Sequence, residues 1–158
     1  MEHTGEPTES LLLEDQLCFA LYAASRAVTA VYRPLLDELG LTYPQYLVML
    51  VLWERGSLSV KEVSTALHLD YGTVTPLLKR LEALGLVSRR RRTDDERGVE
   101  VALTDRGRKL RERAGGVPVE LGRAFGLDPA DRGALRDTLV VLTRSLTDHA
   151  QAAGRRSA

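Results

Sequence analysis

The chain of 158 residues has little of what metal sites, disulfides and membrane spans require. It contains one cysteine, Cys18, and three scattered histidines. A single cysteine excludes a disulfide within the chain and any multi-cysteine metal site. No apolar run reaches the length of a membrane span, and the acidic first residues lack the basic region of a secretory signal. We therefore expect a cytoplasmic protein with no metal and no other cofactor.

An excess of positive charge is also missing, because the formal net charge is zero. The charges are unevenly distributed, however. Residues 1–16 contain five acids and no Lys or Arg, whereas residues 79–97 contain seven basic residues against four acids. Phosphate binding depends on the local field, and the second segment is locally positive. The charge pattern is thus compatible with a nucleic-acid partner.

The stretch from Ser59 to Thr104 contains the elements of a winged helix-turn-helix in order. Ser59 and Glu62 have the spacing of a capping box at the start of one helix. Asp70 begins a second helix, and Gly85 ends it. Two strand-like runs, 86–92 and 99–103, flank a polar turn, and Leu58 is a candidate third strand. The sequence predicts a mainly α fold with a small β-hairpin wing, and residues 41–104 form its DNA-binding region.

Helical patterns at 11–40 and 105–150 flank this region. Pro34 predicts a kink or break near residues 32–33. Gly115, Gly116 and Pro118 interrupt the helix after Thr104, and the sequence leaves open whether it resumes. A narrow seam of leucines in steps of four and three is typical of coiled coils; it comprises Leu135, Leu139, Leu142 and Leu146.

That seam has two interpretations. It could pack on the chain's own core, or it could join the first helix in a homodimer interface. We favour the dimer, because a protein that binds a palindromic DNA site needs two DNA-binding domains (heads) about one turn of the DNA helix apart. The predicted dimerisation segments are then 11–40 and 105–150. Residues 1–10 and 151–158 are predicted to be flexible ends.

The second helix and the hairpin carry the candidate DNA contacts: Thr73, Thr75, Pro76, Lys79, Arg80, Arg89, Arg91, Asp95 and Arg97. Threonine reads base edges, whereas Lys and Arg favour phosphates. Pro76 stiffens the reading end of its helix. Arg97 is placed to enter the minor groove, with Asp95 orienting it. A merely solvated, charged hairpin is the alternative for the arginines.

Several segments resemble the MarR family of transcriptional regulators. Asp95-Glu96-Arg97 followed by residues 99–104 resembles that family's D-x-R…LT wing signature. The resemblance to the MarR family extends roughly from Leu12 to Leu146. Within that family, residues 15–22, 32–37, 41–46 and 72–82 resemble the organic hydroperoxide repressors of the OhrR type. This resemblance implies a dimeric repressor on palindromic operator DNA, released by oxidation of a cysteine, and not a turnover enzyme.

Tyr71 departs from the pattern, since a small residue such as Ser is expected there, which bears on operator preference. No second cysteine is present, so the chain resembles the one-cysteine type.

Cys18 is the candidate redox sensor under this resemblance. A lone cysteine on an apolar helix is more often a small buried hydrophobe. Cys18, however, lies within about two turns of the expected helix start, where the helix dipole favours an anion. Tyr22 is four residues later on the same face. Tyr32 and Tyr43 could supply phenolic hydroxyls, from a partner subunit or a neighbouring helix, that hold a thiolate.

The oxidant implied is an organic hydroperoxide, which would convert the Cys18 thiolate to a sulfenic acid. A low-molecular-weight thiol could cap that product, or it could cyclise to a sulfenamide or oxidise further. Three rival interpretations stay open. The chain could be a thiol peroxidase, although no strand-rich thioredoxin pattern is present. It could be a regulator released by a phenolic ligand, with Cys18 structural, or an architectural DNA-binding protein without a switch.

Overall fold

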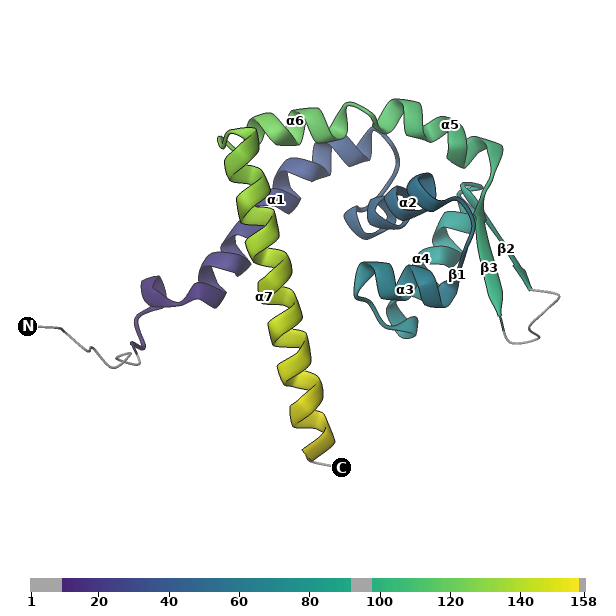
Figure 1. Cartoon of the computed structure of the whole chain (residues 1–158). Helices are drawn as coiled ribbons and strands as arrows, with labels where there is room; N and C mark the ends of the chain where they lie inside the picture. The colour runs from purple at the N-terminus through teal and green to yellow at the C-terminus, as the bar shows by residue number, and fades with distance from the viewer. Residues whose placement is uncertain (1–9, 92–97, 157–158) are drawn as a thin grey trace, which may run out of the picture. The chain divides into compact units, whose positions relative to one another are not determined.

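The computed structural model describes residues 10–91 and 98–156 (Figure 1). Its contacts divide the chain into two compact units, Met1–Pro118 and Val119–Ala158. The first unit contains, in order, η1 (Leu13–Asp15), α1 (Leu17–Asp37), α2 (Tyr43–Arg55), β1 (Leu58–Ser59), α3 (Val60–Leu67), α4 (Tyr71–Ala83), β2 (Val87–Arg91), β3 (Val99–Leu103) and α5 (Asp105–Ala114). Then follow α6 (Val117–Ala124), which crosses the division, and α7 (Pro129–Arg156).

The first long helix begins later than the sequence predicts. The apolar pattern starts at Leu11, but a short 3-10 turn precedes α1 and Gln16 is extended, with ψ 112°. Local hydrogen bonds stabilise this turn, because the Ser10 hydroxyl donates to Asp15 at 2.5 Å and the Gln16 amide donates to the Ser10 carbonyl at 2.6 Å. Such bonds compete with helix formation. Of the kink or break predicted near Pro34, the break is excluded, because α1 continues through Pro34 to Asp37.

Helix α2 lies at the centre of the first unit. Thr42 and Gln45 form a capping box at its start, with Pro44 in the first turn. The fully buried side chains of α2 join the hydrophobic core; they are Tyr46, Val48, Met49 and Leu52. Burial of such side chains contributes roughly 1.5–3 kcal/mol each, so α2 anchors the surrounding elements. The nearly all-round apolar pattern of this segment thus predicted its position correctly.

Helices α3 and α4 and the three strands form the predicted winged helix-turn-helix (Figure 1). Ser59 and Glu62 make the expected capping box, and the Asp70 carboxylate accepts a hydrogen bond from the Thr73 amide at 2.8 Å. The antiparallel sheet has the order β1-β3-β2. Leu58 pairs with Val101, which confirms the predicted third strand, and Val87 pairs with Leu103.

The C-terminal helices answer one question that the sequence left open and differ from expectation at one place. After Thr104 caps α5, the interruption at Gly115 and Gly116 is short and the chain resumes as α6. Asp128 caps α7, as predicted, by accepting from the Asp131 amide at 2.8 Å. Helix α7 then continues to Arg156, through residues that the sequence assigns to a flexible tail. Alanines such as Ala150, Ala152 and Ala153 favour helix, which explains the extension.

Candidate nucleic-acid interface and redox site

Helix α4 has one buried side and one open side. The buried side chains are Val74, Leu77, Leu78 and Leu81. The predicted reading residues lie away from them: Thr73, Pro76, Lys79 and Arg80 are exposed, and Thr75 is half-buried. The Asp70 cap fixes the start of the helix. The N-terminal residues of a recognition helix are the ones that reach base edges, so this side of α4 has the arrangement a DNA reader requires.

Arg89 and Arg91, the predicted DNA contacts that lie on β2, have different surroundings. The strand register pairs Arg89 with Val101 and Arg91 with Val99, so both lie on one face of the sheet. The guanidinium of Arg89 contacts the Glu82 carboxylate of α4, with Nη2 to Oε2 at 2.8 Å. Arg91 is exposed. Asp95 and Arg97, the predicted wing-tip residues, lie outside the described residues.

Cys18 is the second residue of α1 and is exposed. The late start of the helix therefore places this cysteine in the first turn, nearer to the helix N-terminus than the sequence predicts. Gln16 provides no side-chain cap for that turn. Unfulfilled amides and the helix dipole make such a position favourable for an anion.

Tyr22 lies one turn after Cys18 on the same side of α1, as the spacing predicts. Its side chain is 58% exposed. Its hydroxyl accepts a hydrogen bond from Arg26 Nη1 at 3.0 Å, and the guanidinium carbon is 5.7 Å from the ring centroid. Tyr22 is thus held by Arg26 beside the cysteine.

Three tyrosines form a cluster where α1 meets α2. The ring centroids of Tyr32 and Tyr43 are 4.6 Å apart, and those of Tyr32 and Tyr46 are 5.8 Å apart. Burial raises the pKa of all three phenols, and most strongly that of Tyr32, where the neighbouring phenols add to the effect. The hydroxyls therefore remain protonated donors at neutral pH. The sequence singled out Tyr32 and Tyr43 but assigned Tyr46 only to the core, because spacing along α2 does not reveal the contact with α1.

Cys18 and the tyrosine cluster are far apart within one chain. Tyr32 follows Cys18 by fourteen residues in the same continuous helix, which is a rise of about 21 Å. Tyr43 packs on Tyr32 and is equally remote. Within one chain these phenols therefore do not reach Cys18, so a neighbouring helix of the same chain does not supply them.

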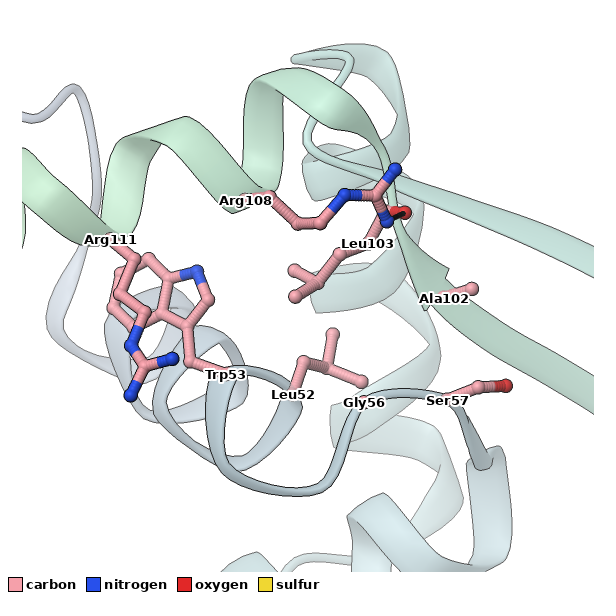
Figure 2. Close-up of a pocket in the computed structure, with 8 residues that line it drawn as sticks. All are labelled: Leu52, Trp53, Gly56, Ser57, Ala102, Leu103, Arg108 and Arg111. Atoms are coloured by element: carbon pink, nitrogen blue, oxygen red, sulfur yellow. Dashed lines mark hydrogen bonds between the residues drawn. The ribbon is translucent and has the colours of Figure 1, made fainter.

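A separate pocket of about 400 Å³ lies where α2, β3 and α5 meet (Figure 2). Its apolar floor includes Leu52, Trp53 and Leu103. Arg108 lies over Leu103 in Figure 2 and donates to the Leu103 carbonyl at 2.9 Å. The indole of Trp53 donates to the Gly107 carbonyl at 2.9 Å, which ties α2 to α5 at the base of the wing.

Two further observations concern residues 10–91 and 98–156. No cluster of three or more His, Cys, Asp or Glu side chains there is arranged to hold a metal ion. None of the helices in these ranges combines the length and the apolar character that crossing a bilayer requires.

A helix-turn-helix with an open second helix, followed by an antiparallel hairpin, defines a winged-helix DNA-binding protein. Comparisons with known proteins support the same class. The family described as transcriptional regulator SarA/Rot matches residues 30–113. The organic hydroperoxide resistance transcriptional regulator of Bacillus subtilis is 46% identical over 141 residues, covering 87% of this chain and 94% of that protein. The HTH-type transcriptional regulator TtmR of Methylorubrum extorquens is 51% identical over 152 residues, covering 96% and 76%.

Among solved structures, reduced AbfR bound to DNA has a TM-score of 0.71 at 34% identity, covering 85% of this chain and 93% of that one. The chain therefore belongs to the MarR family of winged-helix transcriptional regulators, in the group of organic hydroperoxide resistance regulators. The family and the fold class predicted from the sequence are both confirmed.

Proposed function

We propose that the chain is a repressor that binds palindromic operator DNA as a homodimer and leaves it when an organic hydroperoxide oxidises Cys18. The observation that carries the proposal is the placement of Cys18, exposed in the first turn of α1. This placement occurs in a chain 46% identical to an organic hydroperoxide resistance regulator.

The proposed DNA contacts follow from the open side of α4 and from the wing. Thr73 and Thr75 would read base edges, and Lys79 and Arg80 would bind phosphates. Pro76 stiffens the reading end between them. Arg91 would bind the backbone from the wing, with Arg97 in the minor groove and Asp95 orienting it. Two such heads, related by a two-fold axis, would occupy successive major grooves.

The proposed dimer would bury apolar faces that a single chain leaves open. On the N-terminal segment, Leu17 is 62% exposed and Phe19 is 40% exposed. On α7, Leu135 is 49% exposed and Leu146 is 58% exposed. Exposed apolar surface of this extent favours a protein partner, and a second copy of the chain supplies matching faces.

The proposed sensing site would be shared between the two subunits. If two copies of α1 run antiparallel, Cys18 of one subunit meets Tyr32 and Tyr43 of the partner subunit. Their protonated hydroxyls would donate hydrogen bonds to the thiolate. Tyr22 of the same subunit would border the site. The apolar neighbours Leu17 and Phe19 would favour organic over hydrated peroxides.

In the proposed reaction the Cys18 thiolate attacks the distal oxygen of the hydroperoxide. A sulfur–oxygen bond forms, the O–O bond breaks, and the alkoxide leaves and takes a proton to become an alcohol. Sulfur is oxidised to sulfenic acid, and the peroxide is reduced. A low-molecular-weight thiol could then condense with the sulfenic acid to a mixed disulfide, releasing water. Sulfenamide formation and further oxidation are the competing fates.

A related protein, AbfR, is known in several oxidation states, and its overoxidised form has been solved while still bound to DNA. AbfR has been solved reduced on DNA, overoxidised on DNA and in a disulfide-formed state. Because the present chain has one cysteine, any disulfide would need a second molecule. The proposed change in bonding at Cys18 would shift α1 and thereby the spacing of the two heads.

The test is binding to the gene's own upstream DNA, with and without an organic hydroperoxide, by the wild type and Cys18→Ser. We expect release in the wild type and persistent binding in the variant. Equal binding in both, with or without peroxide, would overturn the redox switch and favour a regulator released by a small phenolic ligand, with Cys18 structural. Equal release in both would assign the switch to another residue.

A further inference from the structure

A charged side-chain contact joins the recognition helix to the wing. Glu82 lies in the last turn of α4, and Arg89 is the third residue of β2. Arg89 Nε donates to Glu82 Oε2 at 2.9 Å, and Nη2 lies 2.8 Å from the same oxygen. The backbone amide of Arg89 donates to Oε1 at 3.2 Å. Both carboxylate oxygens are therefore used.

The sheet register explains why Arg89 faces α4. Its cross-strand partner Val101 is fully buried, so the Arg89 side chain extends over the face of the sheet that meets the helices. Side-chain exposure is 26% for Arg89 and 39% for Glu82. The hydrogen bond from Arg89 also holds the pKa of Glu82 below its usual value. Arg91 shares this face but lies further along the strand and is exposed.

The position of β2 gives the contact a mechanical role. In the order β1-β3-β2, β2 is an edge strand with a neighbour on one side only. Edge strands are held weakly on their open side. Glu82 binds the open side of β2 through the Arg89 amide and guanidinium, and thus limits how far the hairpin can move relative to α4.

We propose that the Glu82–Arg89 pair is a positioning element that sets the wing against the recognition helix, and that Arg89 affects DNA affinity through Glu82 and not as a phosphate ligand. The inference rests on the proposed DNA binding. A winged-helix head engages DNA with its helix and its wing together, so a loosely held wing would lose part of the contact. The Glu82 carboxylate occupies the Nε and Nη2 edge of the Arg89 guanidinium and neutralises its charge, so a phosphate would find only the remaining N–H groups of an already paired arginine.

The test compares Glu82→Ala, Arg89→Ala, Arg89→Lys and the charge-exchanged double variant Glu82→Arg/Arg89→Glu on upstream DNA over a range of salt concentrations. We expect both alanine variants to weaken binding roughly ten-fold without changing the salt slope. Lysine cannot reproduce the two-pronged contact, so Arg89→Lys should behave like Arg89→Ala. The double variant should recover affinity. Arg91→Ala, on the same face without the Glu82 contact, should lower the slope by about one.

The opposite pattern would overturn the inference. If Arg89 binds phosphate, Arg89→Ala should lower the salt slope, Arg89→Lys should retain affinity, and Glu82→Ala should tighten binding by freeing the guanidinium. Amide exchange in β2 provides a readout without DNA: we expect faster exchange in Glu82→Ala than in the wild type, and unchanged exchange would count against a positioning role. If the wild type fails to bind DNA while β2 still exchanges faster in Glu82→Ala than in the wild type, the proposed function is overturned and the positioning contact stays supported.

Discussion

At the scale of single residues, the proposed sensor separates a nucleophile from the groups that would stabilise it. Cys18 lies in the first turn of α1 and the phenols of Tyr32, Tyr43 and Tyr46 lie near its other end. At the start of α1, backbone dipoles favour a negative charge on Cys18. Near the other end, burial keeps the tyrosine hydroxyls protonated. The proposed sensor requires both halves together.

The buried phenols predict a loss of stability in alkali. Their folded-state pKa values are raised, so above about pH 10 the unfolded chain releases protons that the folded chain retains. The free energy of unfolding should therefore fall as pH rises beyond that point. Urea unfolding at increasing pH measures the slope. Tyr32→Phe should reduce it, whereas Tyr22→Phe, which alters an exposed ring, should leave it unchanged. An equal slope in all three proteins would contradict this explanation.

Tyr71 is predicted to affect base preference. It is the first residue of α4, is 54% exposed, and by helical spacing lies next to Thr75, a predicted reading residue. Tyr71→Ser should relax discrimination at the adjacent base pairs by roughly 1–3 kcal/mol. Selection from randomised duplexes measures this effect. Tyr71→Phe retains the ring and serves as the control, and identical selected sequences for the wild type and Tyr71→Ser would exclude Tyr71 from recognition.

At the scale of elements, the join between α5 and the α4–β2 turn depends on a close approach at Gly107. A Cβ atom there would lie 2.1 Å from the Leu86 carbonyl oxygen. Trp53 of α2 binds the Gly107 carbonyl, so three elements meet at this residue. The wing is thereby fixed at its base as well as by the pair described above.

Gly107→Ala should destabilise the protein by roughly 1–3 kcal/mol, because the added methyl overpacks against backbone. Gly116→Ala is the matched control, since nothing lies within 4 Å of its added Cβ; its effect should stay within about 0.5 kcal/mol. Chemical denaturation of the two variants measures the difference. Equal free energies of unfolding for the two variants would show that the backbone around Gly107 accommodates the methyl group without loss of stability.

The elements were predictable where local chemistry determines them. The caps at Thr42, Ser59, Asp70 and Asp128 appear as expected, because each satisfies helix amides within three residues. The start of α1 was misplaced, since the hydrogen bonds from Ser10 to Asp15 and from the Gln16 side chain to the Ser10 carbonyl do not follow from apolar periodicity. Tyr46 in the aromatic cluster and the pairing of Arg89 with Glu82 were missed because both depend on contacts between elements.

At the scale of the whole molecule, the exposed leucine seam of α7 predicts that a single charged substitution in it can prevent dimer formation. Leu139→Glu should convert a dimer to monomers, because it buries a carboxylate in an apolar interface. Sedimentation velocity measures the association state. DNA affinity should fall by roughly a hundred-fold or more as the two heads are unlinked. Arg144→Glu, on the opposite side of α7 by helical spacing, should remain dimeric. A dimeric Leu139→Glu protein would place the interface elsewhere.

The measurement that tests the shared sensing site most directly uses a heterodimer. One subunit carries Cys18→Ser with intact tyrosines, and the other carries Tyr32→Phe and Tyr43→Phe with intact Cys18. If the site is built between subunits, the remaining cysteine faces intact phenols of the partner subunit. Mass spectrometry should then show sulfenic acid forming on it at the wild-type rate after addition of an organic hydroperoxide. A rate as slow as that of the homodimer lacking both phenols would contradict a site built between subunits.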